Sequence, residues 1–122
     1  MKDFRNLQVW SRSHALTLDI YRATVTFPKE ELFGLTSQMR RCSASIGANI
    51  AEGCGRRGNG EFHKFLQIST GSASELEYHL LLARDLGFIS SEREKVLTLQ
   101  VQEVKKMLAG LIRKVEAERA KF

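Results

Sequence analysis

The chain has 122 residues, which is enough for one domain with a single core and too few for two domains. Its composition, 43% hydrophobic and 27% charged, is typical of a soluble globular protein, and no apolar run approaches the roughly 20 residues of a membrane span. Lys and Arg number 19 against 14 Asp and Glu, and this net charge of +5 favours an acidic partner such as nucleic acid over a merely solvated surface. The first ten residues, MKDFRNLQVW, lack the apolar segment of a secretory signal, so we expect a cytoplasmic protein.

The first predicted element is a helix over about residues 7–26, which carries two apolar stripes. Steps of three and four place one set of residues on a single stripe: Leu7, Trp10, His14, Leu18, Tyr21 and Val25. The second stripe lies on nearly the opposite side and holds Val9, Leu16, Ile20 and Ala23. Phe27-Pro28 ends the helix, because the residue before a proline is pushed out of the helical region. Two stripes are more than one bundle core buries, so we expect Val9, Leu16 and Ile20 to contact other helices or other subunits.

The second predicted helix covers about residues 35–53 and is rich in small side chains. Its apolar face reads Leu35, Met39, Cys42, Ile46 and Ile50, and it is surrounded by Ser43, Ala44, Gly47, Ala48 and Ala51, which let a neighbouring helix approach closely. Asn49 and Glu52 lie among these residues, so we expect both to be at least half buried. Buried polar groups need partners, and we expect bonds between helices or subunits here, with a binding-site role as the alternative.

A glycine-rich segment follows, in which Gly53, Gly55 and Gly58 match the G-x-G-x-x-G pattern of dinucleotide sites. That pattern binds a cofactor only where it links a strand to a helix, whereas here a helix precedes it. We therefore predict a helix-to-helix turn, with Gly53 or Gly55 in the left-handed conformation and Asn59 or Gly60 capping the next helix. Arg56 and Arg57 would lie at its tip, where the free backbone donors of a helix N-terminus can hold a phosphate.

Two further helices complete the chain, at about residues 60–86 and 91–119. The core face of the third holds Phe62, Phe65, Leu66, Ser69, Ala73, Leu76, Leu80 and Ala83, whereas Ile68 and Leu82 stand off that face and are candidate contacts with another helix or subunit. Gly87 is a helix stop, and Ser91 to Glu94 is a capping box. The fourth helix then carries a coiled-coil-like seam: Leu97, Val101, Val104, Leu108, Leu111 and Val115.

No segment alternates like a strand, and the connections are short. We therefore predict one all-α domain over residues 1–122, an antiparallel up-down-up-down four-helix bundle. Its surplus apolar surface needs a partner, and the simplest partner is a further copy of the chain, so we expect a homo-oligomer.

The two cysteines, Cys42 and Cys54, are too few for a disulfide framework. On one helix they would lie about 18 Å apart, beyond bridging distance. We expect both to be reduced and structural, with a reactive or metal-binding role as the alternative.

Motifs for catalysis or metal binding are absent from the sequence. His63 and His79 would lie about 24 Å apart along one helix, too far to share an ion. Glu75 and His79 share a helix face, but a di-iron bundle needs carboxylates from all four helices. No Ser-His-Asp pattern is present either, so we predict no enzymatic activity, no cofactor and no metal site.

Basic residues come in pairs, and copies of the chain in an oligomer would multiply their charge. Such a surface binds phosphate backbones with strong salt dependence and little sequence preference. The candidate nucleic-acid contacts are Arg40, Arg41, Arg56, Arg57, Lys105 and Lys106.

Several segments resemble the bacterial four-helix-bundle family named for intervening sequences in large-subunit ribosomal RNA genes, to which the accessory variability determinant proteins of diversity-generating retroelements are related. They are FRNLQVW (4–10), TFP (26–28), GLTSQMRRCSASIGANIAEGCGR (34–56), EFHKFL (61–66) and GSASELEYHL (71–80). The resemblance implies a homopentameric barrel with no established enzymatic activity. The retroelement branch binds nucleic acid and pairs with a reverse transcriptase, which would place Arg40, Arg41, Arg56 and Arg57 among the contacts.

The sequence therefore predicts a non-enzymatic, cytoplasmic homo-oligomer, a pentamer by the resemblance, that binds RNA or DNA without sequence preference. The alternative is a protein-interaction scaffold, or an accessory subunit of a nucleic-acid enzyme such as a reverse transcriptase, that does not bind nucleic acid itself. No membrane partner is expected.

Overall fold

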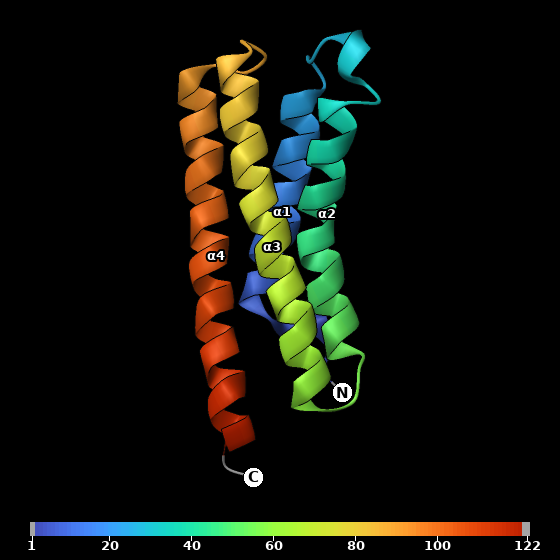
Figure 1. Ribbon diagram of the computed structural model, residues 1–122, viewed down its shortest axis with the longest axis vertical. Helices are drawn as coiled ribbons and strands as arrows, with labels where there is room; N and C mark the ends of the chain where they lie inside the picture. The colour runs from blue at the N-terminus through green and yellow to red at the C-terminus, as the bar shows by residue number, and fades with distance from the viewer. Residues whose placement is uncertain (1, 121–122) are drawn as a thin grey trace.

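The computed structural model describes residues 2–120, and within that range it contains four long helices and no strand (Figure 1). The helices are α1 (Gln8–Thr24), α2 (Leu35–Cys54), α3 (Gly58–Asp85) and α4 (Ser91–Ala120), with short 3-10 helices η1 (Phe4–Asn6) and η2 (Lys29–Glu31). Each predicted boundary lies within two residues of the observed one.

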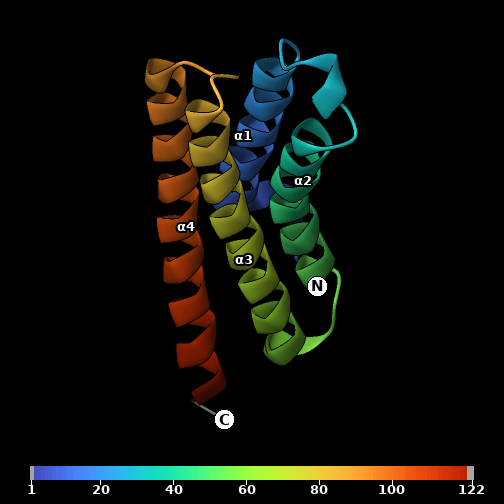
Figure 2. The same ribbon diagram turned by 45° about the horizontal axis from the view of Figure 1, so that its top comes forward.

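The four helices run antiparallel in succession, as the two views show (Figures 1 and 2). Helix α1 packs against α2 and α4, and α3 packs against the same two helices, so sequence neighbours are also neighbours in space. This confirms the predicted all-α up-down-up-down bundle. Assembly into a homo-oligomer stays a prediction.

The core is apolar and runs the length of the bundle. Side chains with essentially no exposed surface come from every helix, among them Leu16, Met39, Leu76 and Leu108. Where a polar group enters the core it is hydrogen-bonded: the Ser69 hydroxyl on α3 donates to the Ile46 carbonyl on α2 at 2.8 Å. Such a bond satisfies a buried group and also fixes how the two helices sit against each other.

The structure places the second stripe of α1 in the core and leaves part of the first stripe exposed. Val9, Leu16 and Ile20 are buried in the core of the same chain, so they contact other helices. The exposed large apolar residues are instead Leu18 and Tyr21 of α1 and Val25 directly after it, at 41%, 43% and 72% of their full surface. Any second copy that covers α1 must therefore use the first stripe.

The α2–α3 turn differs from its prediction. Gly53 lies inside α2, Gly55 has an ordinary φ of −82°, and the positive φ of +78° belongs to Gly58, the first residue of α3. The prediction of a left-handed Gly53 or Gly55 is wrong, because α2 continues past Gly53 and the chain reverses only at Gly58. Asn59 does not cap α3 either, since its side-chain amide donates to the Glu118 carboxylate on α4 at 3.1 Å. Gly60 likewise lies inside α3.

At the α3–α4 turn the predicted end of α3 is confirmed, whereas the predicted cap of α4 is shifted. Gly87 has a φ of +78°, and the Phe88 N–H donates to the Ala83 carbonyl at 2.9 Å, so Gly87 ends α3 as expected. The N-terminal cap of α4 is shifted by one residue, because the Ser90 hydroxyl accepts from the Arg93 N–H at 3.1 Å. Ser91 is already helical.

Candidate functional site

A basic cluster lies at the end of the bundle that carries the α2–α3 turn. The segment before η1 folds against this turn, where the Lys2 N–H donates to the Cys54 carbonyl at 3.2 Å. The Lys2 ammonium lies 4.8 Å from the centre of the Phe62 ring. Lys2 and Arg56 thereby line one polar hollow together with Asn59 of α3. Lys2 was not among the predicted contacts, because its position depends on a backbone bond to a residue 52 positions away.

The N-terminus of α3 opens at the same place. Arg57 precedes the helix, and no side chain within residues 2–120 accepts a hydrogen bond from its first backbone N–H groups as a cap. These donors and the helix dipole create positive potential at this end. Together with Lys2, Arg56 and Arg57, they form what we call the basic end of the bundle.

Arg56 and Arg57 differ in whether their guanidinium groups already contact other side chains. The Arg56 guanidinium lies 3.2 Å from the Glu52 carboxylate and 5.2 Å from the centre of the Phe65 ring. Arg57 is exposed and forms no ion pair with any residue from 2 to 120. Glu52 is exposed as well, so its predicted burial is wrong: its side chain lies on the outer face of α2, one turn before Arg56.

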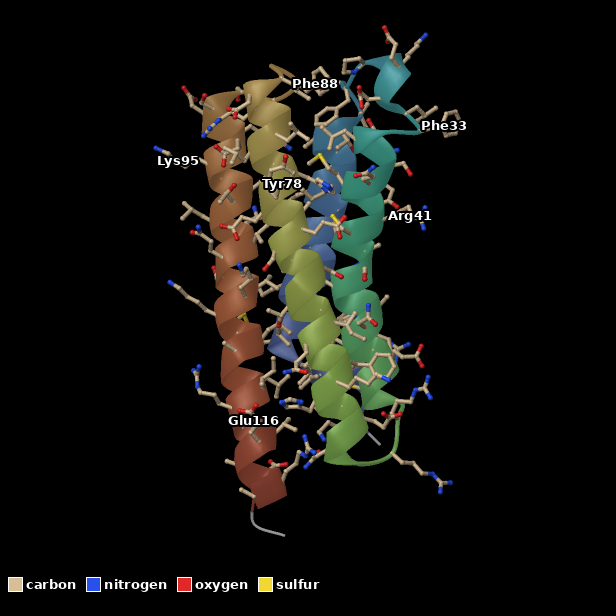
Figure 3. All side chains as sticks on the ribbon, in the orientation of Figure 1. Phe33, Arg41, Tyr78, Phe88, Lys95 and Glu116 are labelled. Atoms are coloured by element: carbon tan, nitrogen blue, oxygen red, sulfur yellow. The ribbon has the colours of Figure 1, made fainter. Side chains whose placement is uncertain are left out.

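Arg40 holds α1 and α2 together. Its Nε donates to the Thr24 hydroxyl at 2.9 Å, and its terminal nitrogen donates to the Tyr21 carbonyl at 3.3 Å. Its guanidinium also stacks 4.8 Å above the Tyr21 ring. These contacts satisfy groups in the last turn of α1, whereas the neighbouring Arg41 projects outward into solvent (Figure 3).

Lys105 and Lys106 lie on α4, which does not pack against α2. The Lys105 ammonium lies 3.1 Å from the Glu77 carboxylate of α3, which also accepts from the Gln102 amide at 3.1 Å. The hydrogen bond from Gln102, followed by the hydrogen bond and the positive charge of Lys105, lowers the pKa of Glu77 below its ordinary value. Lys106 is exposed. The six predicted basic residues therefore occupy separate parts of the surface, and only Arg56 and Arg57 lie at the basic end.

The remaining predicted contact residues are divided between surface and core. Asn49 is half-buried, and its amide donates to the Ser45 carbonyl at 2.8 Å and hydroxyl at 2.9 Å, so its bonds stay within α2. Ile68 is exposed on α3, whereas Leu82 is partly buried against the core.

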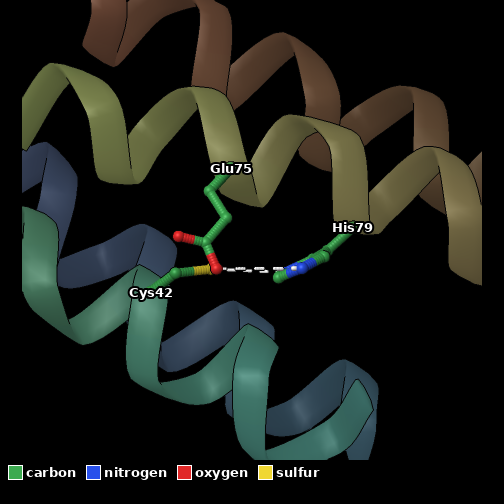
Figure 4. A group of neighbouring side chains, drawn as sticks. All are labelled: Cys42, Glu75 and His79. Atoms are coloured by element: carbon green, nitrogen blue, oxygen red, sulfur yellow. Dashed lines mark hydrogen bonds and ion pairs between the residues drawn. The ribbon is translucent and has the colours of Figure 1, made fainter.

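A cluster of three residues, Cys42, Glu75 and His79, was not predicted from the sequence. Cys42 Sγ on α2 lies 3.6 Å from Nδ1 of His79 on α3, and the other ring nitrogen, Nε2, lies 3.8 Å from the Glu75 carboxylate (Figure 4). Cys42 and His79 are both only 6% exposed. Burial, with a contribution from Glu75, raises the pKa of the Cys42 thiol to about 12. Cys42 lies 12 residues before the end of α2 and Glu75 lies 17 residues after the start of α3, so counting outward from the turn would not have brought them together.

Comparisons with known proteins show a protein family and a solved structure to which the chain is similar. The sequence model of the family described as 23S rRNA-intervening sequence protein matches residues 5–110. A similar solved structure is that of a protein with unknown function from the S23 ribosomal protein family of Bacteroides thetaiotaomicron. It is 28% identical, has a TM-score of 0.77, and the match covers 85% of this chain and 97% of that one. No curated protein matches the chain. None of the helices in residues 2–120 has the length and apolar character needed to cross a membrane.

Proposed function

The chain belongs to the 23S rRNA-intervening sequence protein family, and on that premise we propose that it is a non-enzymatic helical bundle that binds RNA or DNA. The binding is through phosphate groups and has little sequence preference. The observation that carries this proposal is the basic end, where Lys2, Arg56 and Arg57 meet the uncapped N-terminus of α3.

The chemistry of this end suits a phosphate. Backbone N–H groups at a helix N-terminus donate to anions, and the helix dipole adds favourable potential. Arg57 has no competing carboxylate among the described residues, whereas Arg56 must exchange its Glu52 partner for a phosphate oxygen. A net charge of +5 over the whole chain supports attraction at longer range.

The assembly we propose is a homo-oligomer, with five copies by the family resemblance described above. Leu18 and Tyr21 of α1, with Val25 directly after it, supply the apolar surface that a second copy would cover. A ring would present the basic end once per copy, and five copies would carry about +25 by the sequence count, which strengthens phosphate binding.

The second candidate function is a scaffold or accessory subunit for a nucleic-acid enzyme such as a reverse transcriptase. The observation in its favour is apolar surface at the connection between α1 and α2, where Phe33 is 93% exposed and projects away from the bundle (Figure 3). Exposed aromatic residues are typical of protein contacts.

A titration of labelled RNA and DNA of several unrelated sequences, at low and moderate salt, tests the first candidate against the second. We expect similar affinities for all sequences and a linear fall of log affinity with log salt concentration. Absence of binding at low salt would refute direct binding and favour the scaffold.

A further inference from the structure

We propose that Cys42, Glu75 and His79 form a binding site for one zinc-type transition-metal ion, held between α2 and α3. The three residues are drawn in Figure 4, and their sequence neighbours Arg41 and Tyr78 lie in the upper half of the bundle in Figure 3, away from the basic end. It is independent of the proposed nucleic-acid binding, and either can fail without the other.

The spacing of the side-chain atoms is the first argument. In tetrahedral zinc sites the Zn–S bond is about 2.3 Å and the Zn–N bond about 2.0–2.1 Å, so the two ligand atoms lie about 3.6 Å apart. The distance between Cys42 Sγ and His79 Nδ1 is 3.6 Å. One ligand atom from each of the three residues can be chosen so that all lie within 4.8 Å of one another. An ion could therefore bind without movement of either helix backbone.

The chemistry of the ligands is the second argument. A thiolate, an imidazole and a carboxylate are the three side chains that zinc takes from proteins, and three protein ligands leave a fourth position for water. Cys42 and His79 are buried and held by packing, whereas the Glu75 side chain is 56% exposed and can turn onto the ion. The result is a site with two rigid ligands and one adjustable ligand.

Access and charge are the third argument. A surface hollow in the groove between α2 and α3 is lined by Cys42 and Glu75, so an ion can reach both from solvent. Binding displaces the thiol proton, and a divalent ion with one thiolate, one carboxylate and a neutral imidazole carries no net charge. Arg41 also lines the hollow, and its positive charge favours an anion such as hydroxide or chloride at the fourth position.

The test is a titration of the reduced, tag-free full-length protein with Co²⁺, followed by Zn²⁺. Tetrahedral Co²⁺ bound to a thiolate gives an intense visible spectrum and a sulfur-to-cobalt charge-transfer band in the near ultraviolet. We expect both signals to saturate at one ion per chain and to disappear when Zn²⁺ displaces Co²⁺. A spectrum without the charge-transfer band would overturn the proposal.

Variants identify the ligands. We expect Cys42→Ser to abolish the charge-transfer band and Glu75→Gln and His79→Gln to weaken Co²⁺ binding at least tenfold. Matched controls are Cys54→Ser, which removes the other buried thiol, and His63→Gln, whose imidazole also contacts a carboxylate, that of Glu116 at 2.8 Å. We expect both controls to bind as the parent does.

Glu75→Gln decides the outcome if a buried variant fails to fold, because Glu75 is exposed and its replacement leaves the core unchanged. Circular dichroism verifies the helical content of each variant. Unchanged affinity in Glu75→Gln, or a band that depends on Cys54, would overturn the assignment of the three ligands.

Discussion

A Cβ atom added to Gly53 of α2 would lie 2.9 Å from the Cβ atom of Phe65 on α3. Real Cβ atoms do not approach so closely, so α2 and α3 can pack at this distance only because Gly53 has no side chain. Gly53 thus serves close packing next to the turn, and its backbone conformation is that of an ordinary helical residue.

We predict that Gly53→Ala destabilises the fold by about 1–3 kcal/mol, because the new methyl group pushes α3 away from α2. The measurement is urea unfolding followed by circular dichroism. The matched control is Gly71→Ala on α3, where an added Cβ meets nothing within 4 Å. This control should gain up to about 1 kcal/mol, because alanine favours helix more than glycine does. Equal stability of the two variants would contradict the packing role of Gly53.

The sequence predicts helix positions well here because an apolar residue at every third or fourth position is a local signal. It does not predict which stripe of α1 faces inward, since Leu16 and Leu18 are equally apolar. That choice depends on contacts with other helices, such as the Thr17 hydroxyl bond to the Ser43 carbonyl of α2 at 2.9 Å. The proximity of Cys42 to His79 likewise depends on how α2 and α3 are positioned against each other. Residue spacing within one helix does not predict that position.

The Glu77 carboxylate provides a prediction about acid stability. Its pKa is lowered in the folded chain, so its contribution is present above the unfolded pKa and is lost as the pH falls through the folded pKa. We predict that Glu77→Gln lowers the free energy of unfolding at neutral pH by on the order of 1 kcal/mol, since this pair is partly exposed. The difference from the parent should shrink as the pH falls through the lowered pKa and disappear once the carboxylate is protonated in both states.

Thermal or urea unfolding at a series of pH values measures this effect. The control is Glu30→Gln, in an exposed residue of η2 that forms no ion pair with the described residues. We expect Glu30→Gln to follow the parent at every pH. A Glu77→Gln deficit that persists undiminished in acid would show that packing, and not the charge, stabilises the contact with α4.

The exposed stripe of α1 leads to a prediction about assembly. We expect the parent chain to sediment as an oligomer at micromolar concentration, and Leu18→Glu with Val25→Glu to shift it to smaller species, because two buried charges would face the partner. Analytical ultracentrifugation measures the change. The control is Leu99→Glu, which adds a charge at an exposed leucine of α4. A monomeric parent would refute the assembly, and dissociation by Leu99→Glu alone would move the interface to α4.

The basic end leads to a prediction about nucleic-acid binding. We predict that Lys2→Ala with Arg57→Ala weakens binding to unrelated RNA sequences alike and flattens the salt dependence, with a loss of about 0.7 in log–log slope for each contact to a single strand. The matched control removes two exposed lysines at the other end of the bundle, Lys29→Ala in η2 with Lys95→Ala in α4, and so changes the net charge equally (Figures 1 and 3). Equal effects of the two double variants would show that total charge matters and that the basic end does not.

Arg40→Ala separates a structural arginine from a phosphate-binding one. Arg40 bonds to Thr24 and Tyr21 in the last turn of α1, so its loss removes one hydrogen bond from each of these groups and should cost about 1–2 kcal/mol of stability. Because its guanidinium already stacks on the Tyr21 ring, the salt slope for RNA binding should stay that of the parent. Unfolding and binding are measured on the same preparation. A flatter slope at unchanged stability would place Arg40 on the nucleic acid after all, and would extend the binding surface from the basic end along α2.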